Sequence, residues 1–154
     1  YDGQKNNRQK LIIGMVAEMI VYEKLQEDQN IENVKWVSRY AARVEPAYSG
    51  YNPHGTDGLG YDIEYTDRTG NKNFVEVKGK ADNQNYFEIT IPEIEKAKQE
   101  KKFYHIIFVT NTLNEELRRI KYLGNLFMFE EGEDLLNNKR FSAVTKSYEI
   151  RFKE

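Results

Sequence analysis

Three side chains in one short stretch of the sequence could do chemistry together. Asp62 lies in an alternating run at residues 61–65, and Glu76 and Lys78 lie in a second such run. A period of two indicates β-strands, and the turn-rich residues 66–72 between the runs predict a hairpin. Because pairing in either register preserves the parity of the pleat, the three side chains are predicted to share one face of the hairpin.

Two converging carboxylates form a hard-oxygen site that suits magnesium or manganese, ions that keep water molecules for activation. Asp62 and Glu76 are therefore candidate metal ligands. Lys78 could orient or deprotonate the attacking water, or stabilise charge on a phosphoryl group. Together these roles suit hydrolysis of a phosphodiester. The alternative is a solvent-facing hairpin surface on which the same side chains form ordinary cross-strand ion pairs.

A further acid, Glu18, lies within a predicted helix. Apolar residues recur at helical spacing over residues 11–25, and Glu18 falls inside the stripe that Met15 and Tyr22 belong to. A carboxylate in such a stripe must find a partner or a metal, or else be neutralised. Glu18 is thus a candidate site residue and metal ligand, with a structural ion pair or hydrogen-bond acceptor as its alternative.

The remaining pattern predicts an α/β fold with a mixed central sheet flanked by helices. The nearly unbroken apolar run at residues 103–109 is typical of a strand covered on both faces and is expected at the centre of the sheet. The other predicted strands are residues 34–38, 87–90, 118–122, 125–129 and 145–152. A helix is expected from Pro92 to about Lys102, a helical turn at residues 131–137, and a glycine-rich loop at residues 48–60.

Other polar residues are secondary candidates, each with a plainer alternative. Asp57 and Glu64 could add acids to the site or serve as a loop cap and a surface charge. His54 could touch phosphate, whereas His105 is expected to be a core residue. Tyrosines near the site could stack on bases or pack at its rim: Tyr48, Tyr51, Tyr61 and Tyr86. Basic residues after Lys96 could bind phosphate, but interleaved glutamates favour a mixed-charge surface.

Composition places broad limits on the protein. With 154 residues, it is most simply one domain, and its 13% aromatic content argues against disorder. The absence of cysteine excludes disulfides and fits the cytoplasm. A net charge of −2 gives no global attraction to nucleic acid, although a local patch is compatible with it. The first residue is Tyr rather than Met, and no apolar run reaches membrane-spanning length, so we expect a domain excised from a longer, non-membrane protein.

Five blocks of the chain resemble a known family in order as well as in type. They are Gly14 to Glu18, Gly58 to Ile63, Phe74 to Gly79, Phe87 to Thr90, and Glu93. Asp62 followed by Glu76-Val77-Lys78 resembles the signature of the PD-(D/E)XK nuclease-like superfamily. The whole set is similar to the domain named after the C terminus of the NO VEIN protein. The resemblance departs at Ile91 and Pro92, where the family pattern has a polar residue before Glu93.

The resemblance implies a restriction-endonuclease-like core with Asp62 and Glu76 as metal ligands, Lys78 as catalytic lysine and Glu18 as auxiliary acid. It also implies a place in DNA restriction or defence, beside ATPase or helicase modules. We therefore expect a magnesium-dependent endonuclease acting on DNA, with RNA as an open alternative substrate and a homo-oligomer as an open possibility. The competing hypothesis is a non-catalytic module that binds nucleic acid or protein.

Overall fold

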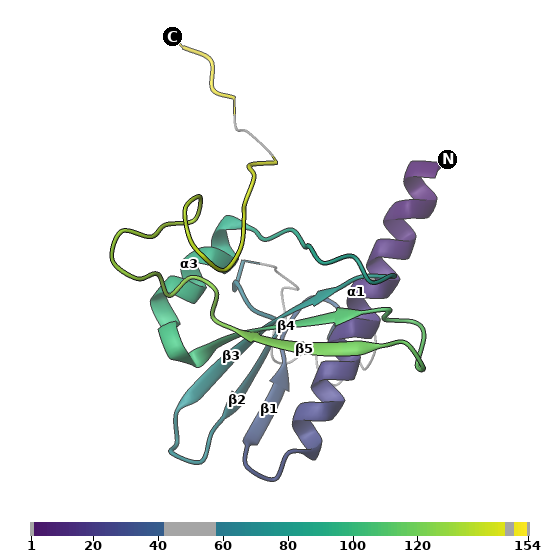
Figure 1. Cartoon of the computed structure of the whole chain (residues 1–154). Coiled ribbons are helices and arrows are strands. Elements are labelled where there is room, and N and C mark those ends of the chain that lie inside the picture. Colours follow the sequence, from purple (N-terminus) through teal and green to yellow (C-terminus); the bar gives the residue numbers. More distant parts are fainter. Residues whose placement is uncertain (1, 42–57, 147–149, 154) are drawn as a thin grey trace.

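The computed structural model describes residues 2–41, 58–146 and 150–153, and it shows the α/β fold that the sequence predicts (Figure 1). The N-terminal half holds α1 (Asp2–Glu27), β1 (Glu32–Trp36), β2 (Ile63–Thr66) and β3 (Lys72–Gly79). Then follow α3 (Ile91–Glu100), the 3-10 turn η2 (Lys101–Phe103), β4 (Tyr104–Thr110) and β5 (Arg119–Gly124). In the described part of the chain, no helix is long and apolar enough to cross a membrane.

The strands form one mixed sheet in the order β1-β2-β3-β4-β5. β2 and β3 form the predicted antiparallel hairpin, with Ile63 opposite Val75. β3 and β4 are parallel, because α3 carries the chain back across the sheet between them. The central strand is therefore β3, which bears Glu76 and Lys78. The expectation that the apolar strand at residues 103–109 would lie at the centre was wrong: β4 is an inner strand with β5 beyond it.

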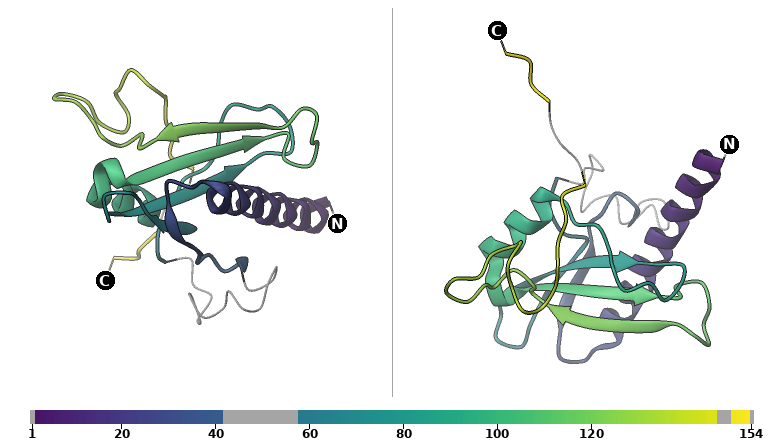
Figure 2. Two further views of the ribbon diagram at one scale, coloured as in Figure 1. Left: turned by 90° about the horizontal axis from the view of Figure 1, so that it is seen from below. Right: turned by 45° about the horizontal axis from the view of Figure 1, so that its top comes forward.

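Each face of the sheet has its own core. α1 covers one face, where Ala17 and Val21 pack against Val75 and Val77 (Figure 2). α1 and β3 approach each other so closely here that a Cβ atom added to Gly79 would lie 2.8 Å from the Cβ atom of Ala17. α3 covers the other face. The cluster there contains Phe74, Ile94, Ala97, Tyr104, Ile106 and Phe127.

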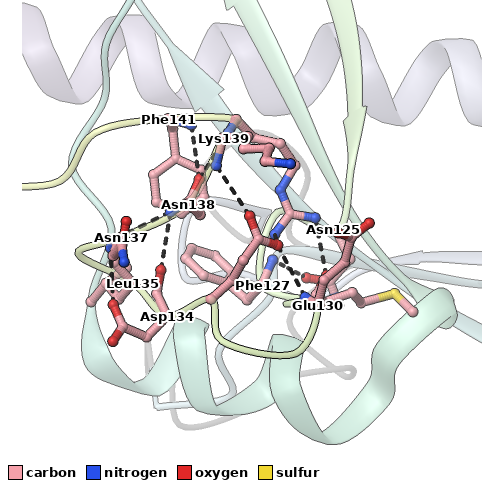
Figure 3. A network of polar contacts seen from close by, with 12 residues as sticks. Asn125, Phe127, Glu130, Asp134, Leu135, Asn137, Asn138, Lys139 and Phe141 are labelled. Carbon is pink, nitrogen blue, oxygen red and sulfur yellow. Dashed lines mark hydrogen bonds and ion pairs between the residues drawn. The ribbon is translucent and has the colours of Figure 1, made fainter.

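The chain after β5 completes this second core without forming the strand and helical turn that we expected at residues 125–129 and 131–137. Asn125 donates from Nδ2 to the carbonyl oxygens of Ala97 and Lys101, both at 2.7 Å, and so caps the end of α3. Figure 3 shows this amide together with the turns that follow it. Side-chain oxygens of Asp134 and Asn138 accept backbone N–H groups in those turns. Such local hydrogen bonds compete with helix and strand formation.

Three further boundaries differ from expectation. Residues 87–90 form no strand, and Phe87 and Ile89 pack on the second core instead. α1 begins at Asp2, well before the apolar stripe, since the stripe marks only the part of the helix that packs on the sheet. At the predicted last strand, the described residues 145–146 and 150–153 form no strand. The expected helix after Pro92 is confirmed as α3 and η2.

Candidate active site

A cleft of about 590 Å³ opens where β3 ends and α3 begins. Its described lining comes from α1, from the residues after β1 and before β2, from β3, and from the first turn of α3. Asp62, Glu76, Lys78 and Glu18 all line it. The structure therefore brings the four predicted site residues to one cavity, although they come from different elements.

Asp62 and Glu76 lie side by side because Asp62 immediately precedes β2 and Glu76 lies in the neighbouring strand β3. The N–H of Asp62 donates to the carbonyl oxygen of Val75 at 2.8 Å, which extends the pairing of the hairpin by one residue. In return, the N–H of Val77 donates to Asp62 Oδ2 at 2.8 Å and fixes the carboxylate against β3. Glu76 is only 5% exposed, and a hydrogen bond links its carboxyl group to that of Asp62.

Lys78 joins Glu76 to a carboxylate on the opposite side of the cleft. Its Nζ lies 3.1 Å from Glu76 Oε1 and 2.8 Å from Oε1 of Glu93, a residue of α3. All three side chains are largely buried. Lys78 is the only basic residue among the described residues that line the cleft, whereas three carboxylates surround it: Asp62, Glu76 and Glu93.

Burial makes Asp62 and Glu76 unusually weak acids. Desolvation raises the pKa of Asp62 from its ordinary 3.8 to about 7, against the opposing effects of the Val77 N–H and of Lys78. Desolvation and the neighbouring Asp62 charge raise the pKa of Glu76 well above its usual range. The described side chains thus supply too little positive charge to make ionisation of both carboxyl groups favourable near neutral pH. A bound cation would stabilise the ionised form of both groups.

Lys78 has the opposite character. Burial lowers the pKa of its ammonium group, but the attraction of Glu76 and Glu93 is stronger and raises the pKa overall. The lysine is therefore firmly protonated. Of the roles considered from the sequence, orienting a group or stabilising phosphoryl charge fits this state, whereas deprotonating water does not.

Glu18 reaches the same cleft from the other layer of the fold. It is 4% exposed, and its Oε1 accepts hydrogen bonds from Trp36 Nε1 at 3.0 Å and from Ser38 Oγ. The Ser38 N–H in turn donates to the carbonyl oxygen of Asp62 at 3.2 Å. Across the described ranges of the chain, no three acidic, histidine or cysteine side chains are grouped closely enough to hold a metal ion. Glu18 thus shares the cavity without forming a compact triad.

Sequence reasoning did not assign Glu93 to the site. Glu93 Oε2 accepts from the N–H of Thr90 at 3.0 Å, and Thr90 Oγ1 accepts from the N–H of Glu93, so the pair forms a capping box at the start of α3. The available signal was Thr90-x-x-Glu93 with Pro92 inside the first turn. That signal predicts a helix start, and only the fold shows that this helix start faces Lys78.

Among the described secondary candidates, Glu64, His105 and Tyr86 do not line the cleft. The carboxylate of Glu64 accepts from Tyr61 Oη at 2.8 Å and pairs with Lys72, although Tyr61 itself lines the cleft. His105 contacts Asn73 and stacks on a tyrosine, as expected of a structural residue. Four candidates lie outside the described residues: Tyr48, Tyr51, His54 and Asp57.

A mixed sheet that presents Asp62 at the start of one strand and Glu76-x-Lys78 on the next, with helices on both faces, defines a PD-(D/E)XK nuclease-like domain. The comparison with protein families agrees. The family described as Protein NO VEIN, C-terminal, matches residues 17–123, and the chain belongs to this family. The match contains every predicted site residue. No curated protein and no solved structure matches the chain.

Proposed function

We propose that this nuclease-like domain hydrolyses phosphodiester bonds of DNA with the help of a divalent metal ion. The observation that supports the proposal is the pair of adjacent carboxyl groups on Asp62 and Glu76, whose pKa values are raised chiefly by burial. Membership of the family supports the nuclease-like class. A role in restriction or defence, in company with ATPase or helicase modules, is part of the same proposal.

The donor set fits magnesium or manganese. Both ions prefer carboxylate oxygens, and magnesium commonly takes only one or two carboxylates while keeping several waters. Asp62 and Glu76 would hold the ion, and Glu18 faces the same cavity as an auxiliary acid. When bound, such an ion supplies a Lewis acid and a more acidic water.

The protein's own residues would prepare the cleft for an anionic substrate. Lys78, kept protonated by Glu76 and Glu93, places a fixed positive charge beside the carboxylate pair. A preorganised charge in a largely buried site stabilises charge that develops on a phosphoryl group. The Val77 N–H holds Asp62 in place, so the geometry does not have to be rebuilt during the reaction.

One observation favours the competing function, a binding module that cuts nothing. In the described part of the chain no compact group of three metal-binding side chains exists. A domain that binds no metal ion at its two adjacent carboxylates would retain the fold and bind nucleic acid or protein without cutting.

Cleavage assays separate the two functions. Purified protein is incubated with plasmid DNA, duplex and single-stranded oligonucleotides, and RNA, each with magnesium, manganese or EDTA. We expect metal-dependent cleavage of DNA that falls by about 10²- to 10³-fold in Lys78→Ala. Lys102→Ala, an exposed lysine beyond α3, is the matched control and should keep full activity. Absence of cleavage on every substrate, with binding retained, would establish the binding module instead.

A further inference from the structure

The face of the sheet that carries the acids continues past the cleft to a lysine. Lys80 follows β3 directly, and its N–H donates to the carbonyl oxygen of Val109 at 2.9 Å, so the extended backbone continues through it. Alternate residues of a strand share a face. Lys80 therefore comes next after Glu76 and Lys78 along the same side of β3, about 7 Å beyond Lys78 at roughly 3.3 Å per residue.

An aromatic ring holds this lysine in place. Lys80 Nζ lies 4.0 Å from the centroid of the Tyr86 ring, and Tyr86 is 57% exposed. The neighbouring Phe87 packs edge to face on Phe108, at 5.1 Å between centroids. Since Phe108 is the register partner of Lys78, this contact anchors the segment beside the site. Tyr86 is thereby kept at the surface with the ammonium group over it.

Other lysines converge on the same place. Lys146 Nζ lies 2.5 Å from Oε1 of Glu88, and both side chains are largely exposed. Lys10 of α1 and Lys80 also act on the Glu88 carboxylate, and together with Lys146 they lower its pKa. Lys146 thus pairs with this glutamate, and the charges of Lys10 and Lys80 act on it as well. In a chain whose net charge is −2, this is a local excess of positive charge.

We propose that this surface, formed by Lys10, Lys80, Tyr86 and Lys146, binds the phosphate backbone of a nucleic-acid strand next to the bond held in the cleft. The inference rests on the proposed function, because it extends the same site along its substrate. Lys78 is the only basic residue among the described residues that line the cleft, so the cleft offers a substrate strand few contacts to its phosphates. A basic surface beside it supplies the attraction that positions the strand, with Lys80 as the contact closest to the reacting bond.

The surface can be tested by binding without cleavage. Affinities of the full chain for short fluorescein-labelled single-stranded DNA, duplex DNA and single-stranded RNA are measured by anisotropy in EDTA over a range of salt. We expect Lys80→Ala to weaken binding by about three- to tenfold and to reduce the slope of log affinity against log salt by about 0.7 to 0.9, the value for one lost phosphate contact. Lys80→Glu should have the larger effect.

The matched control is Lys102→Ala, because Lys102 also lies over an aromatic ring, that of Phe103, but in η2 rather than at the cleft. If Lys80→Ala and Lys102→Ala give the same affinity and salt slope, or if wild-type protein binds none of the three strands, the surface is refuted. Cleavage assays distinguish the two proposals. Wild-type protein that binds through Lys80 but does not cut overturns only the nuclease function, whereas cutting with no effect of Lys80 overturns only the surface.

Discussion

Lys78 donates from Nζ to both carboxylate oxygens of Glu93, at 2.8 and 3.2 Å, across the cleft between β3 and α3. The same Glu93 forms the capping box at the start of α3. One side chain therefore fixes a helix end and holds the lysine of the nuclease-like signature. Because the charge of Glu93 helps to raise the pKa of Lys78, the relationship is electrostatic as well as geometric.

Removing only the charge of Glu93 should separate its two roles. Glutamine can serve in a capping box, so Glu93→Gln should change the free energy of unfolding little, yet it leaves Lys78 without one of its anionic partners. We expect at least a tenfold loss of cleavage, with kcat affected more than KM because the lysine acts on developing charge. Activity assays and urea unfolding on the same preparations give both quantities.

The control for that experiment is Thr90→Ala, which removes one half of the capping box and keeps the charge of Glu93. It should cost about 1 kcal/mol of stability, a typical value for a lost cap, and keep most of the activity per folded molecule. The positioning role of Glu93 is contradicted if the two variants lose activity in proportion to their loss of stability.

The acids should make the metal-free protein less stable at higher pH. Folding raises the pKa of Asp62 from 3.8 to about 7, so between these values the folded state binds a proton that the unfolded state has lost. Stability from this group is therefore fully present below pH 3.8 and is lost as the pH rises through about 7. Glu76 acts in the same direction. Unfolding in EDTA at about pH 5 and about pH 8 measures the difference.

Asp62→Asn should flatten this pH dependence, because the amide does not titrate. The variant is expected to be at least as stable as wild type at about pH 8 in EDTA and to lose its advantage at about pH 5. An unchanged pH profile in Asp62→Asn would mean that the carboxyl group is not desolvated in solution as it is in the structure.

Divalent metal should restore the stability that the metal-free protein loses at higher pH. Magnesium or manganese that binds only the folded state raises the melting temperature with increasing concentration, and the effect should be larger at about pH 8 than at about pH 5, where protons compete for the carboxylates. Asp62→Asn should abolish most of the shift. Glu18→Gln should weaken it less, because Glu18 already accepts from Trp36 and Ser38. Equal losses in both variants would make Glu18 a full ligand.

Two glycines with similar backbone angles test how tightly the cleft is built. Gly60 and Gly70 have φ of +78° and +81°, but a Cβ on Gly60 would lie 2.6 Å from the carbonyl oxygen of Pro92, whereas one on Gly70 meets nothing within 4 Å. Gly70→Ala should cost about 1 to 2 kcal/mol for the left-handed backbone alone. Gly60→Ala should cost at least about 1 kcal/mol more and lower cleavage, because the start of α3 must shift. Equal destabilisation would contradict the close approach.

Local pattern was sufficient for much of the fold. The alternation around Asp62 and along Glu76 and Lys78 predicted the hairpin and its shared face, because the period of a strand is fixed by the backbone. The helical stripe around Glu18 likewise predicted a buried acid. Pro92 correctly predicted the first turn of α3, since a proline is tolerated there.

The expected strand at residues 87–90 failed for a reason that local pattern does not contain. Its alternating Phe87 and Ile89 do pack on the core, but a strand also needs a partner strand beside it, and among the described residues the tertiary structure brings none to this segment. Similarly, the strand and helical turn expected after β5 gave way to side-chain hydrogen bonds such as those of Asn125, which depend on the nearby end of α3.

By itself, the sequence selected four residues that the structure brings to one cleft: Asp62, Glu76, Lys78 and the buried Glu18. The tertiary structure decided the pKa values of these side chains and their hydrogen-bond and ion-pair partners. Burial depends on what packs above a strand, so only the fold shows that the pKa values of Asp62 and Glu76 are raised and that Lys78 stays cationic. Contacts between distant segments likewise pair Glu93 with Lys78 and let Trp36 donate a hydrogen bond to Glu18.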